Sequence, residues 1–230
     1  MDHTVCGILA LAGPIDYFSL FLTSDIIQIL VDETNLYATQ VIQTANDITP
    51  FCLHGWTPTD AKEMEQFVGL LGWMGIVKVA ELPNYWSKSK LSSFDLPKKV
   101  VARNRFELLL RFWHFADNNS SIPGDRTHKI KNVFQKFVEN FKKAYTPGTR
   151  ICIDETMVPF RGRLSFRQYI PSKRHRYGIK LYKLCTDKGY TWHVKVYVGR
   201  DLTGDPTQVT SRNVTLNLIQ DLLADVECST

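Results

Sequence analysis

The chain has 230 residues, of which 44% are hydrophobic, 12% aromatic and 22% charged. This composition is that of a globular protein with enough apolar material for one or two folded domains, and it excludes a chain that is disordered throughout. The formal net charge of +5 is moderate, so by itself it indicates only that an anionic partner is possible.

Residues 1–13 form an N-terminal segment to which no helix, strand or domain is assigned. Within them, residues 5–12 form a short apolar run that resembles a signal peptide, but no Lys or Arg precedes it. The run is also too short to cross a bilayer. A frayed or buried segment is therefore the favoured interpretation, secretion is the alternative, and no membrane partner is expected.

The cysteines offer no metal or disulfide pattern. The chain has five, which are scattered and include no C-x-x-C pair. An odd number without that spacing argues against a disulfide framework and against a cysteine zinc site. We therefore expect reduced thiols and no zinc.

The first part of the chain has helical periodicity. Apolar side chains recur at spacings of three and four in residues 23–45, which predicts an amphipathic helix. A second helix is predicted over residues 57–74, with Thr57 as its cap, Pro58 at the first helical position and Asp60 at the capping-box site.

Two further helices are predicted before the pattern changes. Residues 77–97 are expected to be irregular, and a third helix is expected over residues 102–115. A polar loop then leads to a fourth helix at residues 130–144, which residues 145–148 (YTPG) end.

From residue 150 onward the period is that of strands. Residues 150–158 alternate, while residues 177–186 and 190–198 are rich in β-branched and aromatic side chains. The turn at residues 187–189 suggests that the last two strands form a hairpin. Residues 210–226 return to helical spacing, so the predicted order is helices, three strands and one helix.

A segment free of acidic residues lies between Thr156 and Thr186, and it interleaves Lys and Arg with aromatic side chains. Such a segment creates a positive potential that suits phosphates, and the aromatic rings can stack on bases or hold the segment in shape. A solvated basic loop with its aromatics in the core is the alternative, and composition leaves both open. The candidate nucleic-acid-binding residues are Arg161, Arg163, Arg167, Lys173, Arg174, Arg176 and Lys180.

Asp154 lies in the middle of an otherwise apolar strand, where a buried, unpaired carboxylate would be costly. It is therefore expected to cap, to pair with an arginine or to bind a metal ion. For a lone aspartate the ion pair is the commoner arrangement. The neighbouring Glu155 faces the other side of the strand, so the two carboxylates form no chelating pair.

Three blocks, in this order along the chain, resemble piggyBac-family transposases, and the resemblance spans residues 14–226. They are RNRFE at 103–107 with LRF at 110–112 and HF at 114–115; NFKKAYTPG at 140–148; and IDE at 153–155 with FRGR at 160–163, FR at 166–167, YIP at 169–171 and YGIK at 177–180.

The resemblance implies an α+β protein with a helical dimerisation and DNA-binding region, residues 14–148, followed by a partial RNase H-like (DDE) α/β catalytic domain, residues 149–230. In such proteins three aspartates hold two Mg²⁺ ions, which promote DNA cleavage and strand transfer at TTAA targets. Asp154 matches the first of them and is thus the candidate catalytic residue and metal ligand. The resemblance also implies a nuclear protein, although residues 173–176 (KRHR) make a weak localisation signal.

The chain departs from the family pattern because the strand that should carry the second aspartate is not found, and later aspartates fall in turns or on a helix. We therefore expect a DNA-binding protein that does not cleave DNA alone, with Mg²⁺ binding in doubt. A fragment of an active cut-and-paste transposase is one alternative. An interaction protein that dimerises with full-length relatives is another. The expected partners are DNA, through its phosphate backbone or as transposon ends, and a homodimer or heterodimer partner.

Overall fold

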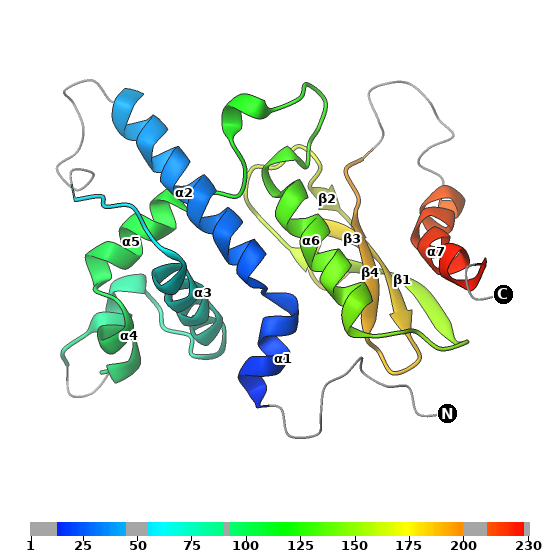
Figure 1. The fold of residues 1–230 in the computed structure, drawn as a ribbon, viewed down its shortest axis with the longest axis horizontal. Helices are drawn as coiled ribbons and strands as arrows, with labels where there is room; N and C mark the ends of the chain where they lie inside the picture. The colour runs from blue at the N-terminus through cyan, green and yellow to red at the C-terminus, as the bar shows by residue number, and fades with distance from the viewer. Residues whose placement is uncertain (1–12, 45–54, 90–92, 200–210, 228–230) are drawn as a thin grey trace. The chain divides into compact units, whose positions relative to one another are not determined.

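The computed structural model describes residues 13–44, 55–89, 93–199 and 211–227 (Figure 1). The apolar run at residues 5–12 lies outside them. The chain divides into two compact units. We call Leu22–Ser121 the helical unit, and we call Met1–Phe21 together with Ile122–Thr230 the sheet unit. Among the described residues no single helix is long and apolar enough to span a membrane; α1 and α2, defined below, pass that test only when taken together as a bent pair.

The helical unit contains four α-helices and two short 3₁₀ helices in its described residues. They are α2 (Ser24–Thr44), α3 (Ala61–Ile76), η2 (Leu82–Trp86), α4 (Asp95–Val100), α5 (Arg103–Phe112) and η3 (Asn118–Ser120). The helices predicted over 23–45, 57–74 and 102–115 are confirmed as α2, α3 and α5. The irregular stretch predicted at 77–97 is corrected, because it contains η2 and the start of α4, which are too short to produce a clear helical period.

Aromatic and aliphatic side chains of α3 and α5 form the centre of this unit. Phe67 of α3 is fully buried, and its ring centroid lies 5.1 Å from that of Phe106 on α5. Aromatic pairs at this separation stabilise the fold by more than the burial of their apolar area alone. The other large buried side chains of the two helices are Met64, Leu70, Leu109 and Phe112.

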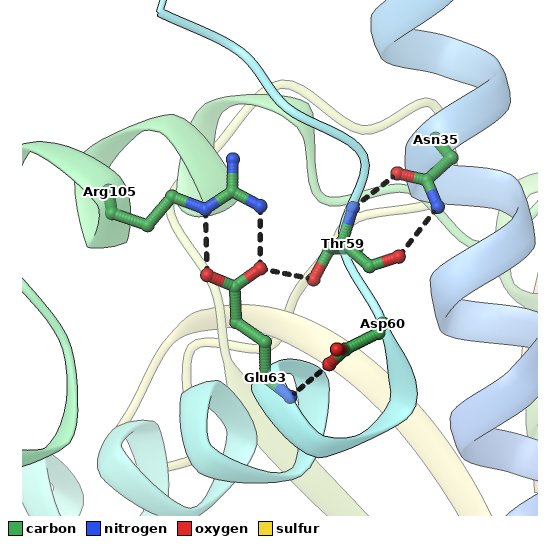
Figure 2. A network of polar contacts seen from close by, with 5 residues as sticks. All are labelled: Asn35, Thr59, Asp60, Glu63 and Arg105. Atoms are coloured by element: carbon green, nitrogen blue, oxygen red, sulfur yellow. Dashed lines mark hydrogen bonds and ion pairs between the residues drawn. The ribbon is translucent and has the colours of Figure 1, made fainter.

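A polar network joins α2, α3 and α5 (Figure 2). The guanidinium of Arg105 donates to both carboxylate oxygens of Glu63, at 2.7 and 2.5 Å. Thr59 Oγ1 donates to the same carboxylate at 2.6 Å. Asn35 then holds the Thr59 backbone from both sides, accepting from its amide at 2.8 Å and donating to its carbonyl at 2.9 Å. The hydrogen bonds from Arg105 hold the pKa of Glu63 below its ordinary value of 4.5.

The start of α3 differs from the prediction. Asp60, rather than Thr57, is the N-cap, because its carboxylate accepts a hydrogen bond from the Glu63 amide at 2.8 Å. Pro58 consequently precedes the helix instead of occupying its first position. An aspartate cap satisfies one of the amide groups that the first turn leaves without a helical partner.

The sheet unit combines two helices from the early part of the chain with all the described strands. Its elements are α1 (Pro14–Phe21), α6 (His128–Ala144), β1 (Ile151–Pro159), β2 (Gln168–Tyr169), β3 (Tyr177–Thr186), β4 (Thr191–Val196) and α7 (Ser211–Glu227). All pairings are antiparallel, and β3 is the strand that pairs with each of the others. The three predicted strands, the fourth predicted helix and the final helix are confirmed, whereas α1 and the two-residue β2 were not predicted.

The sheet has helices packed against it. Tyr182 and Leu184 of β3 and Trp192 of β4 are buried with Val214 and Leu218 of α7. Helix α6 packs along β4 (Figure 1), and the hydroxyl of Tyr190 donates to the carbonyl of Phe141 on α6 at 2.7 Å.

Helix α1 packs on α6, where Asn140 donates to the Phe21 carbonyl at 3.0 Å. The change from helix to strand lies between Ala144 and Ile151, as predicted. The compact units nevertheless do not follow the predicted regions 14–148 and 149–230, because α1 and α6 pack with the sheet unit.

Replacing Arg105 by alanine should lower the free energy of unfolding by about 2 kcal/mol, because the Glu63 carboxylate would stay largely buried without its partner. Urea unfolding followed by tryptophan fluorescence measures this, since Trp56, Trp73, Trp86 and Trp113 all lie in the helical unit. The folded-state pKa of Glu63 is lowered, so the pair's contribution is complete above the ordinary pKa and is lost as the pH falls through the lowered one.

Arg103→Ala is the matched control, because Arg103 lies two residues away on the same helix and pairs with Glu107 at 3.0 Å at the surface. An exposed pair of this kind contributes little, so a loss below about 0.5 kcal/mol is expected. Equal losses for the two variants would contradict a special role for the Arg105 network.

Candidate nucleic-acid interface

The acid-free segment forms a closed loop between two paired strands. We call residues 160–176 the basic loop; it leaves β1 after Pro159, contains β2 and enters β3 at Tyr177. Two backbone hydrogen bonds close it, from the Phe160 amide to the Tyr177 carbonyl at 3.3 Å and from the Ile170 amide to the Arg176 carbonyl at 2.8 Å. Phe166 anchors it, since its side chain is only 3% exposed. The loop therefore has a defined conformation on which cationic side chains are displayed.

Arg167 bonds to the backbone of its own loop. Its Nη1 donates to the carbonyls of Arg161 and Gly162 at 2.9 and 3.0 Å. Its guanidinium carbon also lies 5.2 Å from the centre of the Tyr177 ring, a cation–π arrangement. The guanidinium thus uses hydrogen-bonding capacity on the loop itself, so Arg167 acts mainly as a positioning residue.

Lys180 is also committed to a partner within the protein. Its ammonium lies 2.6 Å from the carboxylate of Glu155 on β1 and over the ring of Tyr182, and its side chain is only 17% exposed. Burial alone would lower the pKa of Lys180, but the hydrogen bonds to Glu155 and Tyr182 outweigh it and raise the pKa. Lys180 therefore remains charged, yet its charge is largely balanced by Glu155.

The other five candidates are exposed side chains of the basic loop, and none makes an ion pair within the described residues. They are Arg161, Arg163, Lys173, Arg174 and Arg176. Arg161, Arg174 and Arg176 come from the two ends of the loop, and the closure of the loop brings them around one hollow of about 480 Å³. The structure thus separates the seven predicted residues into these five and two, Arg167 and Lys180, whose charged groups contact other parts of the protein.

The hollow also contains side chains that were not predicted as site residues. Phe160, His175 and Tyr177 line it together with the arginines. The sequence showed the two rings only as aromatics interleaved with basic residues. Their convergence depends on the loop closure, which brings together positions 17 apart in the chain.

Asp154 is exposed on β1, so the burial that would make it costly does not arise. Its carboxylate accepts a hydrogen bond from the adjacent Glu155 amide at 2.7 Å, and Lys183 is its partner in the strand register. An ion pair with an arginine, one of the three arrangements that the sequence left open, is not found within the described residues. Glu155 pairs with Lys180, on the other side of the strand as predicted.

Asp154 belongs to no cluster of metal-ligand side chains in the part of the chain that the structure describes. Within the described ranges, no group of three or more His, Cys, Asp or Glu side chains could hold a metal ion. A two-metal centre needs several oxygen ligands, and Mg²⁺ prefers near-octahedral oxygen coordination. The described residues therefore do not fit such a centre, and no catalytic step through Mg²⁺ can be derived from them.

Replacing Arg167 by lysine should loosen the basic loop, because an ammonium lacks the planar guanidinium that lies by the Tyr177 ring while its Nη1 donates to the carbonyls of Arg161 and Gly162. Hydrogen exchange at the amides of Ile170 and Lys173, both of which bond within the loop, should become faster. Exchange in β4 should not change.

Arg163→Lys is the control for that experiment. It is the same substitution on the same loop, at an exposed side chain for which the described residues provide no ion pair. Faster exchange in both variants, or in neither, would contradict the positioning role of Arg167.

A family model and curated relatives identify the same family of proteins. A family model described as Transposase IS4 matches residues 13–226. Human piggyBac transposable element-derived protein 3 is 28% identical over 189 residues, which cover 82% of this chain and 30% of that protein. Human piggyBac transposable element-derived protein 2 is 28% identical over 178 residues, covering 77% and 28%.

A solved structure is also similar. It is the cryo-EM structure of the piggyBac transposase synaptic complex with hairpin DNA, with a TM-score of 0.70 and 27% identity, covering 92% of this chain and 44% of that chain. The chain spans less than a third of the length of the two curated relatives named above. From its sequence and its fold, the chain belongs to the piggyBac-type transposase family.

Proposed function

We propose that this transposase-derived chain is a DNA-binding protein, and that its basic loop contacts the phosphate backbone. The observation that carries the proposal is a set of five exposed Lys and Arg side chains on one closed loop, without ion pairs in the described residues. A folded surface normally mixes its charges, so an unbalanced loop of this kind favours a polyanionic partner. The similar solved protein was determined with hairpin DNA, which supports the choice of DNA.

Phosphate contacts should dominate this binding. Each Lys or Arg that neutralises a phosphate releases a counterion from the DNA, and this term does not depend on base sequence. Arg161, Arg174 and Arg176 surround one hollow, where their charges can act on neighbouring phosphates. The proposed partner also implies that the protein works in the nucleus.

We also propose that the chain does not cleave DNA by itself. By resemblance Asp154 matches the first catalytic aspartate of the family, and within the described residues no group of three or more His, Cys, Asp or Glu side chains could hold a metal ion. One carboxylate cannot hold the two cations that in-line phosphoryl transfer of this kind requires. Asp154 therefore serves here as an exposed surface residue.

A second candidate is that the chain is a fragment of an active Mg²⁺-dependent transposase. The observation favouring it is the coverage, since the chain spans less than a third of the two relatives compared above. Asp154 would then be the first metal ligand, and the remaining ligands would come from residues outside the described ranges. Both candidate functions use the basic loop to bind DNA, and they differ only in whether the DNA is also cleaved.

The double variant Arg161→Glu with Arg163→Glu should weaken binding to a fluorescent DNA duplex. The slope of log K against log salt should also become less steep by about 2, because each phosphate that is no longer neutralised reduces it by about 0.9. Fluorescence anisotropy over a salt series measures both quantities, with circular dichroism to check the fold.

A double variant with the same change in net charge is the control for this experiment. Lys188→Glu with Lys195→Glu alters exposed lysines of the sheet unit outside the basic loop, so its effect should be smaller. Equal effects of both pairs would show that only net charge matters, and unchanged affinity in the first pair would remove the basic loop from the proposal.

Incubation of a terminal-repeat duplex with the wild-type chain and Mg²⁺ should produce no nicks on a denaturing gel. The reason is that Asp154 belongs to no group of three or more metal-ligand side chains among the described residues. Nicking that requires Mg²⁺ and disappears in Asp154→Ala would overturn the proposal of an inactive chain and favour the second candidate.

A further inference from the structure

The hollow in the basic loop combines two kinds of surface. Its volume of about 480 Å³ lies within the range of small-molecule pockets, roughly 300–1,000 Å³. The side chains that matter for its chemistry are Phe160, Arg161, Arg174, Arg176 and Tyr177. Arginines without a nearby carboxylate suit a phosphate group, whereas the two rings offer flat apolar faces beside it.

The rings of Phe160 and Tyr177 are partly exposed to solvent. Phe160 is 36% exposed and Tyr177 is 47% exposed. Both lie in a segment without acidic residues, where the partner is expected to be a nucleic acid. A base inside a duplex has both faces covered by its neighbours, so a protein ring can stack on it only where the stack is opened, and an extrahelical base is already open.

The rings are held in place before any partner arrives. A Cβ atom at Gly162 would lie 2.5 Å from Cζ of Phe160, so the ring sits where only glycine leaves room. Tyr177 has the ring of Tyr169 at 4.8 Å and the guanidinium of Arg167 at 5.2 Å. Side chains that are already ordered lose little freedom on binding, which favours affinity.

From this geometry we propose that the hollow binds one unpaired nucleotide of the DNA. The nucleotide's phosphate contacts the guanidinium groups of Arg161, Arg174 and Arg176, and its base lies against the ring of Phe160 or Tyr177. The inference rests on the proposed function, since it assumes that the basic loop binds DNA. It adds a preference for DNA that contains an extrahelical base.

The test compares the full chain on three duplexes of the same sequence. One is fully paired, the second has a single extrahelical adenine, and the third has an abasic site in place of that adenine. Fluorescence anisotropy should show about five- to tenfold tighter binding of the adenine bulge than of the paired duplex, since stacking on a ring favours the unpaired base. The abasic bulge keeps the extra sugar and phosphate but has no base, so it should lose most of this gain.

Variants then locate the effect. Phe160→Leu keeps an apolar side chain but removes the aromatic face, so the ratio of bulge to duplex affinity should fall toward one. Tyr17→Leu is the control, because Tyr17 is an exposed aromatic of α1 in the same unit and does not line the hollow. This variant should keep the wild-type ratio.

A spectroscopic measurement does not depend on any variant. With 2-aminopurine as the extrahelical base, the wild-type chain should quench its fluorescence as the base stacks on a ring. Equal affinity for all three duplexes, or equal gains for the adenine and abasic bulges, would overturn the inference while leaving DNA binding intact. Absence of binding to every duplex in dilute buffer would instead defeat the proposed function.

Discussion

The antiparallel pairing of β1 with β3 is the constraint on which the candidate interface depends. The register places Pro159 opposite Gly178, so the chain leaves one strand and enters the other at adjacent positions. A side chain at Gly178 is excluded, because its Cβ would collide with the carbonyl oxygen of Val158. The close approach of the two backbones therefore requires glycine. Without this junction the two ends of the basic loop would separate, and its arginines would no longer surround one hollow.

The same loop shows how a protein can display cations that repel one another. Arg167 donates to two backbone carbonyls of its own loop, which holds the loop together without any acidic residue. Lys180 lies at the base of the loop and is balanced by Glu155 from the neighbouring strand. The cost of gathering like charges is thus limited by solvent exposure of the remaining five, where water screens them. Their potential remains available to a phosphate.

Periodicity was sufficient to predict the long elements and insufficient to predict their packing. The helix from Ser24 to Thr44 has a clear pattern of period 3.6 and the strand from Ile151 to Pro159 alternates, and both were found. Helix α6 also has a strong helical pattern, but a pattern shows which face is apolar and not which surface will cover it. The contact of α6 with β4 was therefore beyond sequence reasoning.

The candidate site was predicted at the level of the segment and not at the level of the side chain. The sequence around Arg163 and the sequence around Arg167 give no reason to assign the two side chains different roles, since both lie in the same basic segment. Only the fold distinguishes them, because the turn at Leu164 brings Arg167 back toward the carbonyls of Arg161 and Gly162. The cap of α3 was misplaced for a similar reason: Thr57 and Asp60 both suit a cap, and the contact of Asn35 with Thr59 fixes where the helix begins.

Asp154 and the basic loop place different demands on the fold. In the described residues β1 pairs on one side only, with β3, and Asp154 is exposed on it. An exposed, hydrated carboxylate costs the fold little, so its presence needs no compensating partner. A metal centre requires several such groups at once, whereas a basic loop contributes to affinity one side chain at a time. The DNA binding proposed for the basic loop therefore does not depend on a complete set of metal ligands.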